Sequence, residues 1–359
     1  MDIGLYATTH GFGYRDEVNF LARSISVAHM QPVQTAQLAE RLGYHSMWFP
    51  DHVCMPMAST SAHVANASGT RAYESRHTML DAAVVMGAVA VSTSRLKLGT
   101  SVLIAPYRNP LSDARQFATI DQLSGGRLLF GVGAGWMQEE FDALGLEYAK
   151  RAAQTEECIE VYKRAWADEA VGFQGQFYRF EAVSMDPKPV QRPAPPIIYG
   201  GVTVAGARRA ARLCDGFYPI FLDSHAEPGR YAKAQEVIRR ELERQHKDPA
   251  EFAMIGVSSA RLTTADDPKV VDLNQSVRKR RSTTFQARAN PRRICTGTPD
   301  QILTDLERFA QAGYSLMVCF FDCPSGQRQE LEDQMQQFSE QVLPQAAGIV
   351  AQGDWKAQV

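Results

Sequence analysis

The chain has 359 residues, a length that fits one large α/β barrel as well as two smaller domains. Hydrophobic residues make up 45% of it and the formal net charge is −2, which gives no overall electrostatic reason to expect nucleic acid or a membrane as a partner. No run of 18 apolar residues occurs, and the first residues lack the basic region of a secretory signal. We therefore expect a single cytoplasmic domain over residues 1–359.

Apolar runs that we predict to be strands recur along the chain, and helical spacing of apolar residues follows most of them. Strands are predicted at residues 3–8, 46–49, 96–105, 127–132, 197–200, 217–221, 253–262 and 316–321. Helices are predicted at residues 32–42, 78–91, 111–118, 152–166 and 230–245, with further helix starts at Thr203 and at the capping-box pattern of residues 298–301. A small hairpin is expected at residues 173–180.

This alternation predicts a (β/α)8 TIM barrel. The strand runs do not alternate apolar with polar residues, so both faces of each strand should be covered, as in a parallel sheet with helices outside it. Residues 53–77 and 263–297 break the alternation, and we expect them to form lid-like insertions at the C-terminal face of the barrel. No GxGxxG follows a strand, so a Rossmann fold is disfavoured.

Active sites of such barrels lie at the C-terminal ends of the strands, and His52 directly follows the second predicted strand. Its imidazole can act as a general base or acid, or hydrogen-bond an oxygen intermediate. The alternative is that Asp51 caps a turn and His52 is a satisfied core residue. His10, His63 and His77 lie in loops without ligand spacing such as HxxxH, so no metal site is expected.

Candidate binding residues follow the third and fourth predicted strands. Tyr107 and Arg108 can orient a substrate or cofactor, although a solvated arginine fits the pattern equally well. Gly133 and Ala134 are small enough to let a flat ring or a phosphate approach the backbone. Trp136 can form a wall of a substrate pocket, or it can simply be packed in the core.

Gly200, Gly201 and Thr203 stand between a predicted strand and the start of a helix. The N–H groups and dipole at a helix N-terminus favour a phosphate group. Because paired glycines also mark many ordinary turns, the phosphate site and the turn remain two interpretations of the same residues.

Several of these segments together resemble the bacterial luciferase-like superfamily of flavin- and deazaflavin-dependent oxidoreductases. The resemblance is carried by SMWFPDHV, LGTSVLIAPYRNP, IDQLSGGRLLFGVGAGWMQEEFDALG and DPKPVQRPAPPIIYGG, and it covers most of the chain up to about residue 221. It implies a barrel with FMN at its mouth. It also implies that His52 lies beside the isoalloxazine ring and that a non-prolyl cis peptide bond joins Ser101 and Val102 behind the ring.

The resemblance further implies that Gly200, Gly201 and Thr203 bind the cofactor phosphate and that Arg151 supplies a charge. Gly133 and Ala134 would border the cofactor as well. Relatives often have an acid and a serine where the two glycines at 200 and 201 stand, and an arginine in place of Ala134. These departures leave the details of phosphate binding, and FMN in particular, open.

The function that the resemblance implies is a monooxygenase that uses reduced FMN and dioxygen to oxygenate a small organic substrate. The flavin often comes from a separate reductase, and a homodimer is expected. One alternative is hydride transfer with the deazaflavin coenzyme F-420, and another is a barrel that binds flavin without turnover. Residues 277–293 carry seven basic side chains and no acid, which fits either a solvated face or a lid that attracts an anion.

Overall fold

The computed structural model describes residues 1–7, 9, 30–61, 78–221, 228–264, 294–323 and 327–351. The basic segment 277–293 and His10, His63 and His77 therefore lie outside the described residues, as does most of both predicted insertions.

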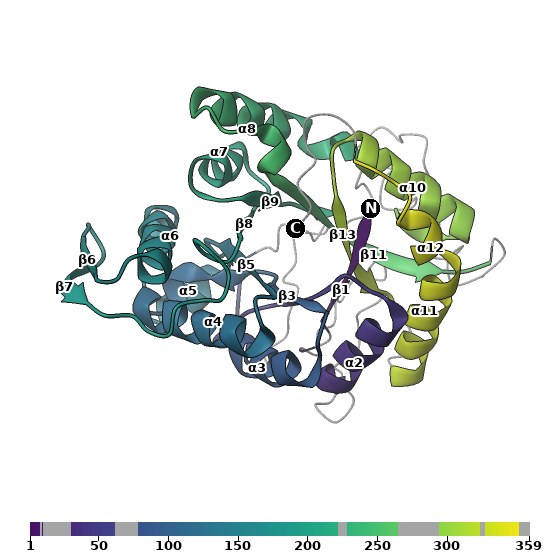
Figure 1. The fold of residues 1–359 in the computed structure, drawn as a ribbon, viewed down its shortest axis with the longest axis horizontal. Helices are drawn as coiled ribbons and strands as arrows, with labels where there is room; N and C mark the ends of the chain where they lie inside the picture. The colour runs from purple at the N-terminus through teal and green to yellow at the C-terminus, as the bar shows by residue number, and fades with distance from the viewer. Residues whose placement is uncertain are drawn as a thin grey trace.

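A closed ring of parallel strands forms the centre of the molecule (Figure 1). Its members are β1 (Asp2–Tyr6), β2 (Ser46–Phe49), β3 (Lys97–Thr100), β5 (Leu128–Gly133), β8 (Ile197–Gly200), β9 (Gly216–Tyr218), β11 (Ala253–Leu262) and β13 (Leu316–Phe321). Neighbours in this order pair in parallel, β9 pairs with β11, and β13 pairs with β1, which closes the ring. The predicted (β/α)8 TIM barrel is therefore confirmed.

Helices surround this ring on the outside (Figure 1). They are α2 (Pro32–Leu42), α3 (Ala82–Ser92), α4 (Pro110–Ser124), α6 (Arg151–Ala167), α7 (Val204–Leu213), α8 (Ala232–Arg244), α10 (Pro299–Gln311) and α11 (Arg328–Gln341), with the short α5 (Gln138–Ala143) and α12 (Leu343–Ala346). The predicted hairpin is the pair β6 (Val171–Gln174) and β7 (Arg179–Val183). Within the described residues, no helix is both long and apolar enough to cross a bilayer.

Capping residues set several helix starts. Thr298 forms the predicted capping box with Gln301, and Thr203 caps α7 by accepting a hydrogen bond from the Gly206 N–H. The helix predicted at residues 78–91 begins later, at Ala82, because the Asp81 side chain caps it. The prediction placed this start too early.

Two predicted strands are interrupted. The run at 96–105 divides into β3 and β4 (Leu103–Ile104), followed by a 3-10 helix at Ala105–Tyr107, and the run at 217–221 divides into β9 and β10 (Ile220–Phe221). The breaks fall at Ser101 and Val102 and at Pro219, inside runs that are otherwise mostly apolar, and the hydrophobic pattern alone did not separate the two parts of each run. Both breaks fall at the rim of the barrel, where they shape the site described below.

The two largest clusters of buried apolar residues lie between the ring and the helices and inside the ring. All ten residues of β11 are buried, as expected for a strand covered on both faces. Inside the ring, Trp48 stacks on Tyr218 with ring centroids 5.1 Å apart. A Cβ at Gly99 would lie 2.3 Å from the Trp48 ring, so the tryptophan requires glycine there.

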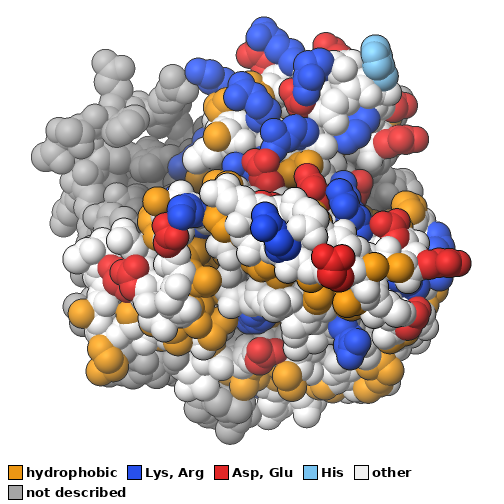
Figure 2. Space-filling view, turned by 90° about the vertical axis from the view of Figure 1, so that its left-hand side faces the viewer, with side chains coloured by type: hydrophobic (Ala, Val, Ile, Leu, Met, Phe, Trp, Pro, Cys, Tyr) orange, Lys and Arg blue, Asp and Glu red, His pale blue; other side chains and the backbone are white. Residues whose placement is uncertain are grey.

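Acidic and basic side chains are interspersed over the coloured part of the face in Figure 2. This mixture agrees with the formal net charge of −2. It gives that face no extended region of a single charge.

Candidate active site

A cavity of about 480 Å³ opens at the C-terminal ends of the strands. This size is within the usual range for a small-molecule site. Of the residues singled out in the sequence, those that line it are His52, Ser101, Val102, Gly133, Ala134, Trp136, Arg151, Gly200, Gly201 and Thr203. The barrel thus brings together residues as distant in the sequence as His52 and Thr203.

The peptide bond between Ser101 and Val102 is cis, as the resemblance implied. The Val102 side chain lies between two glycines of neighbouring strands. A Cβ at Gly133 would be 2.6 Å from Val102 Cγ2, and one at Gly200 would be 2.7 Å from Cγ1. The approach of a ligand was the predicted reason for small residues here, but the Val102 side chain already requires them.

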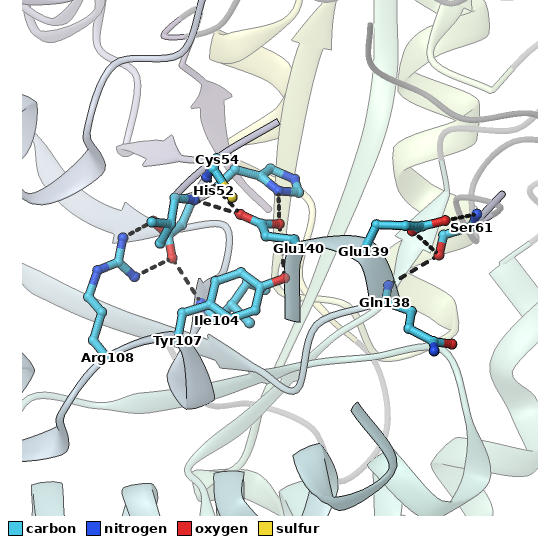
Figure 3. A network of polar contacts seen from close by, with 11 residues as sticks. His52, Cys54, Ser61, Ile104, Tyr107, Arg108, Gln138, Glu139 and Glu140 are labelled. Atoms are coloured by element: carbon cyan, nitrogen blue, oxygen red, sulfur yellow. Dashed lines mark hydrogen bonds and ion pairs between the residues drawn. The ribbon is translucent and has the colours of Figure 1, made fainter. Parts of the chain in front are cut away.

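His52 borders the cavity, and its ring forms a hydrogen bond with Glu140 of α5 (Figure 3). Its Nδ1 lies 2.7 Å from Glu140 Oε2, and both side chains are almost fully buried. The backbone N–H groups of Val53 and Cys54 donate to Glu140 Oε1 at 2.7 and 3.1 Å. Burial by itself would raise the pKa of Glu140, but the hydrogen bonds from His52 and these N–H groups hold that pKa below its ordinary value.

The Tyr107 hydroxyl donates to Glu140 Oε2 at 2.9 Å. Burial, together with the nearby Glu140 charge, raises the pKa of Tyr107 far above its ordinary value, so the phenol keeps its proton. Tyr107 is 8% exposed and lies outside the described lining of the cavity. The structure thus places it behind His52, away from the substrate position that the sequence suggested.

Arg108 forms an ion pair with Asp51. Its two terminal nitrogens donate to the two Asp51 oxygens at 2.8 and 2.6 Å, and the Ile104 N–H donates to the same carboxylate at 3.1 Å. Burial would lower the pKa of Arg108, but Asp51 raises it above its ordinary value. Asp51 therefore does more than cap a turn. Arg108 is only partly exposed, is ion-paired, and lies outside the described cavity lining.

Two arginines border the cavity beside α7. The Arg151 guanidinium lies 3.7 Å from the centre of the Tyr148 ring. Arg209 donates to Glu156 at 2.8 Å and to the Tyr199 hydroxyl at 3.0 Å. Arg209 was not among the predicted site residues, although it lies three and four residues after Gly206 and Ala205 in α7, on the same face of the helix.

The opposite part of the cavity is apolar and aromatic. Tyr6 and Phe320 lie with ring centroids 5.1 Å apart, and Trp136 meets the His52 ring edge-on at 6.2 Å. Met137 is buried in the same cluster. Tyr6 and Phe320 were not among the predicted site residues, because Tyr6 ends an apolar strand, Phe320 is the last but one residue of another, and nothing in the sequence sets them apart from the core.

The donor set of the cavity fits a flavin nucleotide, which has a flat ring and an anionic phosphate. Arg151, Arg209 and the first turn of α7 provide positive charge and N–H donors at one end. Val102 and the aromatic side chains provide apolar surface elsewhere. In the part of the chain that the structure describes, no group of three or more His, Cys, Asp or Glu side chains could hold a metal ion.

A closed barrel of parallel strands with a cavity at the C-terminal ends of those strands is the architecture of TIM-barrel proteins, whose active sites lie at that face. Within that class, the sequence model of the luciferase-like monooxygenase family matches residues 26–316. The chain belongs to this family.

Individual relatives show how far the similarity extends. An FMNH2-dependent dimethylsulfone monooxygenase from Pseudomonas putida is 37% identical over 141 residues, which cover 38% of this chain and 39% of that protein. The chain spans less than two thirds of the length of the curated relatives it matches.

Solved structures resemble the whole fold. A monooxygenase from Streptomyces bottropensis has a TM-score of 0.70 at 21% identity, covering 96% of this chain and 99% of that one. An F420-dependent secondary alcohol dehydrogenase has a TM-score of 0.69 at 20% identity, covering 95% and 98%. At these identities the likeness concerns the fold alone.

Proposed function

We propose that this chain is a flavin-dependent monooxygenase that binds reduced FMN at the mouth of the barrel and oxygenates a small organic substrate. When bound, the reduced flavin supplies two electrons and two protons, so that one atom of dioxygen enters the substrate and the other leaves as water. The observation that carries the proposal is that His52, Val102, Arg151 and Arg209 all line one and the same cavity.

Each part of the cavity has a role in this reaction. Arg151, Arg209 and the start of α7 bind the phosphate, and Val102 supports the flat ring. Tyr6, Trp136 and Phe320 form the apolar side, which excludes water and accepts the substrate.

His52 is the proton-exchanging group of this site. It borders the cavity, and imidazole is the side chain whose ordinary pKa lies nearest to neutrality.

We also propose a separate flavin reductase and a homodimeric assembly, as expected from the family. The reductase proposal is supported by the FMNH2 dependence named for the Pseudomonas putida relative. Dimethyl sulfone, the compound in that name, is small and uncharged and suits the aromatic side of the cavity. It is the first substrate to test.

The binding step is tested by anaerobic titration with reduced FMN and, separately, with reduced F-420. Reduced FMN should bind, and replacing Arg151 and Arg209 together by alanine should weaken its affinity about tenfold or more. Arg208→Ala is the matched control, because Arg208 is exposed on the same helix and lies outside the described cavity lining.

The chemical step is tested by oxygen uptake in the presence of reduced FMN and dimethyl sulfone. His52→Ala should retain FMN binding and lose turnover about 100-fold or more. Binding of F-420 without FMN binding would favour hydride transfer instead. If the protein bound FMN but oxidised none of the small organic compounds tested, a barrel that binds flavin without turnover would be favoured.

A further inference from the structure

Four hydrogen-bond donors converge on the carboxylate of Glu140 (Figure 3). Oε1 accepts from the N–H groups of Val53 and Cys54, and Oε2 accepts from Tyr107 and from His52 Nδ1. An ionised carboxylate offers about four lone-pair positions. Its capacity is therefore filled by these donors.

The state of Glu140 determines the state of the histidine. Because the pKa of Glu140 lies below its ordinary value, the group is an ionised carboxylate near neutral pH and can only accept hydrogen bonds. At 2.7 Å from Oε2, the Nδ1 atom of His52 must carry a hydrogen.

We propose that Glu140 is a positioning residue that fixes His52 in the tautomer with its hydrogen on Nδ1. Any proton that His52 exchanges with a bound molecule then passes through Nε2. The negative charge of Glu140 also stabilises the imidazolium formed when Nε2 accepts a proton. The catalytic consequence rests on the proposed function, whereas the tautomer is a property of this chain alone.

The neighbouring Glu139 provides a matched comparison on the same helix (Figure 3). Its carboxylate accepts hydrogen bonds from the N–H groups of Thr60 and Ser61 at 2.5 and 3.1 Å, and from Ser61 Oγ at 2.6 Å. The two acids of α5 thus hold two points of the same loop, but the contact with the His52 ring is made by Glu140.

The variant Glu140→Gln should invert the tautomer. The Val53 and Cys54 N–H groups hold the carbonyl oxygen of the new amide at the Oε1 position. The amide nitrogen then occupies the Oε2 position and donates to His52 Nδ1, which must accept. The histidine hydrogen consequently moves to Nε2. Glutamine has nearly the volume of glutamate, so packing around the site is preserved.

The direct test is 15N NMR of the cofactor-free protein labelled at histidine, followed up to a pH at which imidazoles are neutral. His52→Gln identifies the His52 signals. Wild type and Glu139→Gln should both show a protonated Nδ1, and Glu140→Gln a protonated Nε2. A protonated Nε2 in wild type overturns the proposal, and so does an unchanged tautomer in Glu140→Gln. If Glu140→Gln does not fold, the wild-type spectrum alone still shows which ring nitrogen of His52 carries the hydrogen.

The catalytic consequence is measured by turnover with reduced FMN and dimethyl sulfone. Glu140→Gln should lower kcat about 100-fold or more with little change in FMN affinity, and Glu139→Gln should keep kcat within a few-fold of wild type. An unchanged kcat in Glu140→Gln contradicts the positioning role. Absence of any turnover in wild type contradicts the proposed function instead and leaves the NMR result to decide the tautomer.

Discussion

Replacing Asp113 by asparagine should make the stability of the folded protein less dependent on pH. Asp113 lies in the first turn of α4 and is completely buried. Its Oδ2 accepts a hydrogen bond from Tyr162 at 3.0 Å, whereas Oδ1 has no hydrogen-bond partner among the described residues. Burial raises the pKa of Asp113 to about 7, although Arg108 and the Tyr162 hydrogen bond act in the opposite direction.

The sign and size of the effect follow from this shift. A carboxyl whose pKa is raised in the folded state binds its proton more tightly when folded. The stabilisation that the Asp113 proton provides is therefore complete below a pH of about 4, the pKa of the carboxyl in the unfolded chain. It is lost as the pH rises through about 7, the pKa in the folded protein. Between pH 5 and pH 8 the loss amounts to about 3 kcal/mol, at about 1.4 kcal/mol per pKa unit.

The measurement is urea unfolding of wild type and Asp113→Asn at both pH values. The free energy of unfolding of the variant should rise relative to wild type by about 3 kcal/mol on going from pH 5 to pH 8. Asp333→Asn, an exposed position on α11, is the matched control and should show no such change. A difference between Asp113→Asn and wild type that is the same at both pH values would refute the reasoning.

Three further substitutions test contacts around the site. Arg108→Met leaves the buried Asp51 carboxylate without its charged partner and should lower the free energy of unfolding by about 3 to 5 kcal/mol. A loss below about 1 kcal/mol in urea unfolding would contradict this. Gly200→Ala should cost about 1 to 3 kcal/mol in the same assay, and adding Val102→Ala should recover most of it, since the new Cβ meets Val102. Thr203→Ala should cost about 1 kcal/mol through loss of the α7 cap, and no change in thermal unfolding would argue against that cap.

Much of the fold could be predicted because local signals and tertiary structure agree. The strands at 46–49, 197–200, 253–262 and 316–321 have the predicted bounds, since each is an apolar run bordered by residues that favour turns or helix starts. The break in the run at 96–105 could not be found in this way, because hydrophobicity reports burial and not the path of the backbone.

The site was predictable only in part. His52 was found from its place after a strand, and the structure puts it in the cavity. Glu140 was missed because an acid beside Glu139 in a short helix has the pattern of an exposed surface position. Its partner His52 lies 88 residues away in the sequence, and nothing local indicates that contact. Tyr107 and Arg108 were placed near the correct strand end, but their hydrogen-bond partners, Glu140 of α5 and Asp51 after β2, come from other parts of the chain.

The measurement that tests the account most directly is a crystal structure of the protein with FMN bound. The flat ring should lie against Val102 and contact His52, and the phosphate should be held by Arg151, Arg209 and the first turn of α7. A ring bound away from His52, or a phosphate bound at another part of the chain, would contradict the proposed site.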